Sequence, residues 1–250
     1  ASQYQPVPKS KPALAVALAD RLDSLVGLFA AGLAPTGTKD PFALRRAAIG
    51  IVQSLIEHDL HFDLSSALQA AAQIQPIPVT GEVLTQVQDF LAGRLRVVLL
   101  DMDCRYDVVD AVLAAQSNDP AGARLAAGQL SAWVARPDWN TILPAFARCV
   151  RILRSVPEDT AQAVEVNPSL LADPAEQALF AALQADTSIP ASIDDFLARV
   201  AFLVPAINIF FDEVLVMAED ETLRRNRLAL VSRIANLSAG LADLSKLEGF

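Results

Sequence analysis

The chain has two histidines, His58 and His61, so any histidine-dependent catalytic dyad or triad would have to use one of them. Asp59 and Asp63 stand beside them, and histidines with carboxylates have the chemistry of a metal site. Their spacing dictates no coordination geometry, however, and a solvated helix end explains the cluster more simply. We therefore predict neither a metal site nor a catalytic residue in this chain.

Motifs of nucleophilic catalysis and of nucleotide binding are also missing. No Gly-x-Ser-x-Gly, Gly-x-x-x-x-Gly-Lys or Gly-x-Gly-x-x-Gly pattern occurs, so we predict no cofactor. Cys104 and Cys149 are too few for a disulfide framework and are typical of a reducing cytoplasm. The longest apolar run, residues 200–211, has 12 residues and is too short for a membrane span. Together these features predict a cytoplasmic protein without membrane contact.

Charge is unevenly distributed. The chain has 20 basic and 29 acidic residues and a net charge of −9, which disfavours a nucleic-acid partner. Two basic groups nevertheless stand out: Arg148, Arg151, Arg224, Arg225, Asn226 and Arg227. Guanidinium groups bind phosphate and stack on unpaired bases, as recognition of a single-stranded RNA loop requires. The alternative is that these arginines pair with nearby acids such as Glu213, Glu219 and Glu221.

Apolar residues at spacings of three and four, which place them on one face of a helix, recur along the chain. The stripes lie in residues 14–29, 44–55, 83–95, 196–214 and 230–244. Glycine is scarce, aromatic residues make up 6% of the chain, and no clear alternating strand pattern is visible. We predict an all-α fold of about nine or ten helices.

Capping signals delimit these stripes. Three Asp-Pro pairs, beginning at Asp40, Asp119 and Asp173, each place a capping carboxylate before a first-turn proline. Thr80 and Ser192 are further caps. Pro205 lies inside a predicted helix, which it should kink. Four loops are predicted: residues 32–39, 74–80, 116–119 and 157–173.

Three long and irregular stretches resemble a known family. Residues 19–48 contain ADRLDSLVGLF and GTKDPFALRRAA, residues 105–114 read RYDVVDAVLA, and residues 210–230 contain FFDEVLVM and LRRNRLAL. In this order and at this spacing they are similar to the C-terminal part of the β subunit of bacterial glycyl-tRNA synthetase. The resemblance extends over nearly the whole chain.

The resemblance implies a division of labour. Glycine activation with ATP and Mg²⁺ would belong to an α subunit or a fused α region, while the β subunit binds tRNA(Gly). Residues 1–80 would be the end of an HD-like domain with its adjoining body. Residues 81–135 would be connecting helices, and residues 136–250 a DALR-like anticodon-binding helical bundle. The chain by itself should then be inactive as a ligase, with no DNA partner.

The family motifs include six residues to which we assign no role: Asp20, Asp23, Lys39, Asp40, Arg45 and Arg46. Asp20 corresponds to a late acidic position of the HD-like domain, whose earlier histidine positions have no counterpart in this chain. His58 does not align with them, so we expect no phosphohydrolase activity. From the residues alone, Asp20 and Asp23 are more simply capping or surface acids.

The resemblance also implies that the two basic groups meet the anticodon loop, with Asn226 as a base reader. Arg148 keeps a basic position of the family, and Arg151 stands where asparagine is common, so we expect it to contact phosphate. The helix after residues 217–220 should offer free N–H groups to a phosphate. Phe210, Phe211 and Met217 are predicted to be core. The alternative function is an acidic helical module that docks the α region without direct RNA contact.

Overall fold

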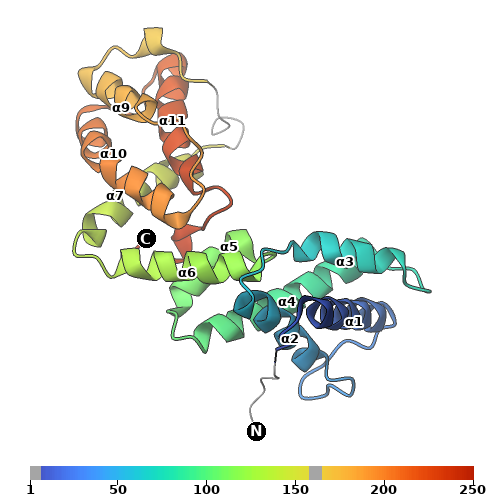
Figure 1. Ribbon diagram of the computed structural model, residues 1–250. Helices are drawn as coiled ribbons and strands as arrows, with labels where there is room; N and C mark the ends of the chain where they lie inside the picture. The colour runs from blue at the N-terminus through green and yellow to red at the C-terminus, as the bar shows by residue number, and fades with distance from the viewer. Residues whose placement is uncertain (1–6, 158–164) are drawn as a thin grey trace. The chain divides into compact units, whose positions relative to one another are not determined.

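A computed structural model describes residues 7–157 and 165–250, which form helices joined by loops (Figure 1). Within these two ranges there are ten α-helices, three short 3₁₀ helices and no strand, which confirms the predicted all-α fold. Two compact units divide the chain, residues 1–128 and 129–250. The expected division at residue 80 therefore falls inside the first unit. Part of the predicted loop 157–173 lies outside the described residues.

The first unit contains α1 (Lys11–Ala30), α2 (Leu44–Glu57), α3 (Leu64–Gln73), α4 (Gly81–Leu100), α5 (Tyr106–Gln116) and the start of α6 (Pro120–Val134). Helix α1 packs against α2, α3 and α4 because its apolar stripe is buried from Leu14 to Phe29. The Phe29 ring meets the Phe90 ring of α4 at a centroid distance of 5.3 Å. Residues 81–100 thus share a core with the helices before them.

The second unit contains the end of α6, α7 (Trp139–Arg154), α9 (Pro174–Gln184), α10 (Ile193–Glu213) and α11 (Glu221–Ala235). It also has 3₁₀ helices at Pro168–Leu170, Asn236–Ser238 and Leu244–Lys246. Helix α7 packs on α10 and α11, and α9 packs on the same two helices. Fully buried Phe146 of α7 and Phe196 of α10 meet edge to face, with centroids 5.3 Å apart. This bundle core fixes the outward faces of α7 and α10.

Most of the predicted caps are observed. The Thr80, Asp173 and Ser192 side chains accept backbone N–H bonds at the starts of α4, α9 and α10, and Asp119 does so for Gly122. The exception is Asp40, whose Pro41 does not begin a helix. Helix α2 begins at Leu44, and the Asp40 carboxylate reaches forward to accept the N–H groups of Leu44 and Arg45 at 2.8 and 3.0 Å.

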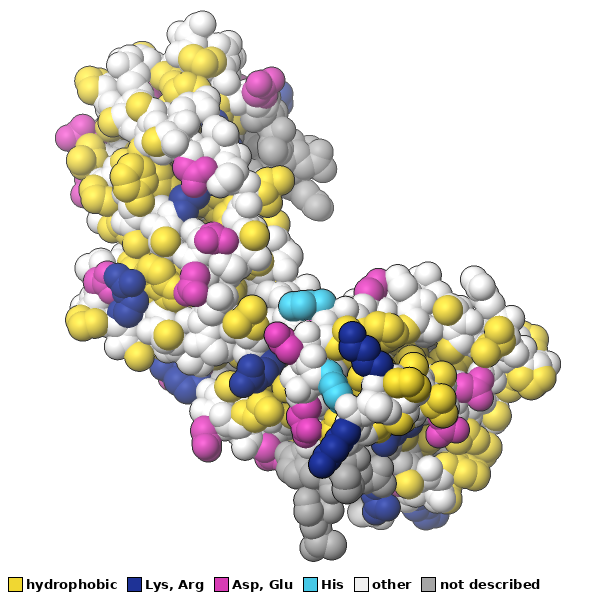
Figure 2. All heavy atoms as spheres, in the orientation of Figure 1, with side chains coloured by type: hydrophobic (Ala, Val, Ile, Leu, Met, Phe, Trp, Pro, Cys, Tyr) yellow, Lys and Arg dark blue, Asp and Glu magenta, His cyan; other side chains and the backbone are white. Residues whose placement is uncertain are grey.

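Helix α10 is the most apolar element of the second unit, and Pro205 lies inside it as expected. Its inner side is fully buried, whereas Phe202 and Ile209 remain 64% and 48% exposed. Figure 2 shows hydrophobic side chains gathered over the α9 and α10 part of this unit, with acidic side chains among them. Among the described helices, none combines the length and the apolar character needed to cross a membrane.

Candidate nucleic-acid interface

Three arginines follow one another along helix α7. Arg148, Arg151 and Arg154 are spaced by three residues, which places neighbours on the same side of a helix. The opposite side of α7 is anchored in the core through Phe146 and Cys149. Because the apolar residues fix the rotation of the helix, the three guanidinium groups face outward. We call Arg148, Arg151 and Arg154 the α7 arginine row.

Two aromatic rings lie beneath this row. The Arg148 guanidinium is 4.7 Å from the centroid of the Phe211 ring, while those of Arg151 and Arg154 are 5.6 and 5.9 Å from the Phe250 ring. Such cation–π contacts hold a guanidinium flat against a ring and leave its other face open. The row therefore presents planar, positively charged surfaces of the kind on which unpaired bases stack.

Carboxylates partly neutralise the row. Arg148 lies 3.2 Å from a carboxylate oxygen of Asp212, which is 68% exposed, and Arg154 lies 3.7 Å from one of Asp243. Arg154 also donates to the Ser245 hydroxyl at 2.9 Å. Exposed ion pairs of this kind stabilise a protein by at most about 1 kcal/mol, so a phosphate can displace the carboxylate. Within residues 7–157 and 165–250, Arg151 has no carboxylate partner.

The start of α11 differs from its expected role as a phosphate site. The Asp220 carboxylate caps this helix and accepts the N–H groups of Thr222 and Leu223 at 2.8 and 3.0 Å. The donors that an incoming phosphate would use are thus occupied by an internal anion. Arg224 turns back and donates to the Ala218 carbonyl at 3.0 Å. Arg225 pairs with Glu221 one turn earlier, at 2.6 Å, and its side chain is 56% exposed.

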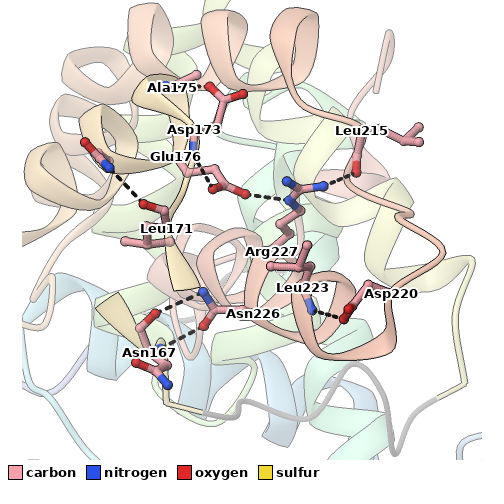
Figure 3. A network of polar contacts seen from close by, with 11 residues as sticks. Asn167, Leu171, Asp173, Ala175, Glu176, Leu215, Asp220, Leu223, Asn226 and Arg227 are labelled. Atoms are coloured by element: carbon pink, nitrogen blue, oxygen red, sulfur yellow. Dashed lines mark hydrogen bonds and ion pairs between the residues drawn. The ribbon is translucent and has the colours of Figure 1, made fainter. Parts of the chain in front are cut away.

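Asn226 and Arg227 belong to a buried network (Figure 3). Asn226 is 6% exposed, and its amide accepts the Asn167 N–H at 2.7 Å and donates to the Asn167 carbonyl at 3.1 Å. Arg227 donates to Glu176, whose side chain is 1% exposed, at 2.5 Å and to the Leu215 carbonyl at 2.8 Å. The second Glu176 oxygen accepts the Asp173 N–H at 3.0 Å. In the structure, both residues join α11 to the segment around α9.

The six predicted residues therefore do not act alike. The structure brings Arg148 and Arg151 together, gives Arg224, Asn226 and Arg227 internal partners, and leaves Arg225 on the surface. Their contact with RNA remains a prediction. Sequence reasoning left out Arg154, Phe211 as a stacking partner, and Phe250. The spacing of three from Arg151 could have identified Arg154, whereas the ring contacts depend on tertiary packing.

The aromatic residues at the end of α10 were predicted to be core, and this is only partly correct. Phe210 is fully buried, but Phe211 is half-buried beneath Arg148. Met217 is 43% exposed because residues 214–220 form a loop in which apolar side chains alternate between the interior and the solvent.

The family-motif residues of the first unit lie on α1 and around the start of α2. Asp20 is exposed, and the Asp23 carboxylate accepts the Gln75 amide at 2.6 Å. Lys39 exchanges backbone bonds with Thr36, and Arg45 donates to the Gly37 carbonyl at 2.6 Å. Together with the Asp40 cap, these contacts order the loop between the two helices. The Arg46 side chain lies on the exposed surface of α2.

The two histidines have separate partners. A ring nitrogen of His58 lies 2.7 Å from the Pro8 carbonyl, and His61 Nδ1 lies 2.7 Å from an Asp119 carboxylate oxygen. The hydrogen bond and charge of Asp119 raise the pKa of His61 above its ordinary value. In the part of the chain that the structure describes, no cluster of three or more potential ligands is arranged to hold a metal ion.

Both units resemble parts of known proteins. Residues 1–114 match the family model of the glycyl-tRNA synthetase beta subunit, and residues 142–244 match that of the DALR anticodon binding domain. The glycine–tRNA ligase beta subunit of Anaeromyxobacter dehalogenans (strain 2CP-C) is 42% identical over 98% of this chain and 37% of its own length. That of Myxococcus xanthus is 39% identical over 97% of this chain and 36% of its own length.

A plant protein is similarly related. Glycine–tRNA ligase, chloroplastic/mitochondrial 2, of Arabidopsis thaliana is 38% identical over 98% of this chain and 23% of its own length. The chain thus spans little more than a third of the bacterial relatives, 36–37%. The two family matches and the relatives agree with the helical bundle described above: the chain belongs to the glycyl-tRNA synthetase β-subunit family and includes its DALR-type anticodon-binding domain.

Proposed function

We propose that this chain is the tRNA-binding part of a glycine–tRNA ligase and that its second unit binds the anticodon arm of tRNA(Gly) through the α7 arginine row. The observation that carries the proposal is the row itself: three outward guanidinium groups at helical spacing, each lying against an aromatic ring. The DALR match covers α7, α9, α10 and α11 and supports an anticodon-binding role for this bundle.

Binding at the row would use two kinds of contact. The guanidinium edges donate to backbone phosphates, displacing the exposed carboxylates of Asp212 and Asp243. The open guanidinium faces stack on bases of the single-stranded loop. Phe211 and Phe250 restrict the rotamers of the arginines, so less conformational entropy is lost when RNA binds.

The remaining steps of aminoacylation belong to the rest of the enzyme. We propose that a companion α subunit, or a fused α region, activates glycine with ATP and Mg²⁺, and that this chain holds the tRNA for it. The chain by itself would then be inactive, would bind no DNA and would work in the cytoplasm. Pyrophosphate exchange that depends on glycine and is catalysed by the purified chain alone would contradict this division.

Direct binding tests the proposal. Affinity for a fluorescent hairpin with the sequence of the tRNA(Gly) anticodon arm would be measured for the wild type and for Arg148→Glu/Arg154→Glu. We expect at least a tenfold loss, because two charge-assisted contacts contribute roughly 1.5–3 kcal/mol each. Arg136→Glu is the matched control, since Arg136 also lies over a ring, that of Trp133 at 4.1 Å, and pairs with Asp138. Equal losses in both variants, or none in either, would refute the assignment to α7.

A further inference from the structure

The outward side of α10 has properties opposite to those of the α7 arginine row. Phe202, Pro205 and Ile209 are exposed and spaced by three and four residues, so they form one apolar stripe on the helix. Beyond the end of α10, Leu215 and Met217 are 71% and 43% exposed. Apolar side chains grouped in this way, rather than scattered singly, mark surfaces that other molecules cover.

A hollow adjoins the stripe. It has a volume of about 610 Å³ and lies between the 185–191 loop and α10, with Ile189, Pro190, Ala198 and Phe202 in its wall. Ile189 at its rim is 90% exposed. The hollow is large enough to receive an apolar side chain from a partner, which would turn the flat stripe into a socket.

Acidic residues surround both features. Between residues 186 and 221 the sequence has eight acidic residues and a single basic one, Arg199. The Arg199 guanidinium is used internally, since it donates to the carbonyls of Leu183, Asp186 and Ser188 and so fixes the loop that borders the hollow. Asp186 and Asp195 line the same hollow. The charge that this face presents to a partner is therefore negative.

These observations identify the kind of partner. A negative surface repels the phosphates of RNA, so the α10 side is unsuited to the ligand proposed for α7. An apolar stripe two helical turns long, about 10 Å, flanked by carboxylates complements a helix with apolar residues at the same spacing and lysines or arginines beside them. The bundle would thus carry two functional faces, one for RNA and one for protein.

We infer that the α10 face, formed by Ile189, Phe202, Ile209 and the acids around the hollow, docks a basic amphipathic helix of the companion subunit of the ligase. This inference rests on the proposed function, which supplies such a subunit as a permanent partner. The apolar contacts would supply most of the binding free energy and the carboxylates the orientation. Because α7 and α10 pack against each other, a partner on α10 would also brace the arginine row from behind.

The test uses the assembled ligase. Phe202→Asp/Ile209→Asp would be compared with Val16→Asp/Leu125→Asp, in which side chains of similar exposure, 70% and 50%, are changed in the first unit. We expect the α10 variant to bind the companion subunit at least tenfold more weakly, with tRNA(Gly) affinity unchanged within twofold. All four side chains are exposed, so circular dichroism should report unchanged helix content and melting for both variants.

Each other outcome overturns the inference. Unchanged subunit binding would show that the face is not used, and equal losses in the control would show a non-specific effect. A selective loss of tRNA affinity would make α10 an RNA contact, and a change only in self-association would make it an interface between copies of this chain. A photo-crosslinking residue at position 202 gives a second measurement, and we expect crosslinks to a lysine- or arginine-rich helix. Failure of the arginine-row test with success here would reject the proposed RNA contact alone.

Discussion

Replacing Arg227 by alanine should destabilise the second unit far more than any change to the neighbouring Arg225. Arg227 is paired with Glu176, and their side chains are 14% and 1% exposed. Arg225 also pairs with a glutamate, but both partners of that pair are more than half exposed. The two arginines are two positions apart on one helix, so they form a matched test of burial rather than of charge.

The magnitude follows from what the substitution leaves behind. Removing one partner of a buried ion pair costs about 3–5 kcal/mol, because the remaining charge is uncompensated. Glu176 keeps the Asp173 N–H, and Arg227 is not completely buried, so we expect a value near 3 kcal/mol at the lower end of that range. For Arg225→Ala the expected cost is about 0.3–0.5 kcal/mol, as for other helix pairs four residues apart.

Thermal and urea unfolding, followed by circular dichroism, would measure both effects. Roughly 3 kcal/mol in a unit of this size corresponds to a drop of about 10 °C in melting temperature. The dependence of tRNA affinity on salt should be unaltered by Arg227→Ala under conditions where the variant is folded. If Arg227→Ala costs no more than Arg225→Ala, or if it changes the salt dependence, Arg227 contacts RNA and its assignment to the buried network is wrong.

Two further predictions concern titratable groups. Asp119→Asn should return the raised pKa of His61 toward its ordinary value in an NMR titration; in the wild type, the stabilisation from this pair should be complete below the unfolded-state pKa, about 6.5, and lost as pH rises through the higher folded pKa. A melting difference between wild type and Asp119→Asn that grew with rising pH would contradict this. Burial raises the pKa of the Cys149 thiol to about 12, so at pH 8 iodoacetamide should label Cys104 first and Cys149 only when the second unit unfolds. Labelling of Cys149 in the folded protein would show that α7 opens locally.

Local signals in the sequence were sufficient to predict the helices and most of their caps. The spacing of apolar residues and of Asp-Pro pairs depends only on neighbours within a few positions, which the sequence displays directly. Asp40 shows where this reasoning stops. Its carboxylate does cap a helix, but that helix begins at Leu44, since Ala43 adopts a left-handed conformation with φ of 55°. Sequence pattern does not reveal that backbone conformation.

The arginines show a different limit. Arg225 and Arg227 are indistinguishable as residue types, yet one points to solvent and the other reaches a buried glutamate 51 positions earlier. Likewise, the ring beneath Arg154 comes from Phe250, which is distant in sequence. Which basic residues remain available to RNA is therefore decided by long-range packing. Both the expected face of five arginines and the base-reading role of Asn226 depended on information that only the fold supplies.

The dependence of tRNA(Gly) affinity on salt tests the central claim most directly, because its slope reports how many phosphates the protein neutralises. Logarithmic plots of affinity against salt concentration would be compared for the wild type and for Arg148→Gln/Arg151→Gln/Arg154→Gln, which keeps hydrogen-bonding side chains but removes the charges of the row. We predict that the slope becomes shallower by about 0.7 for each phosphate that the variant no longer neutralises. A slope identical to that of the wild type would show that the α7 arginine row does not bind RNA.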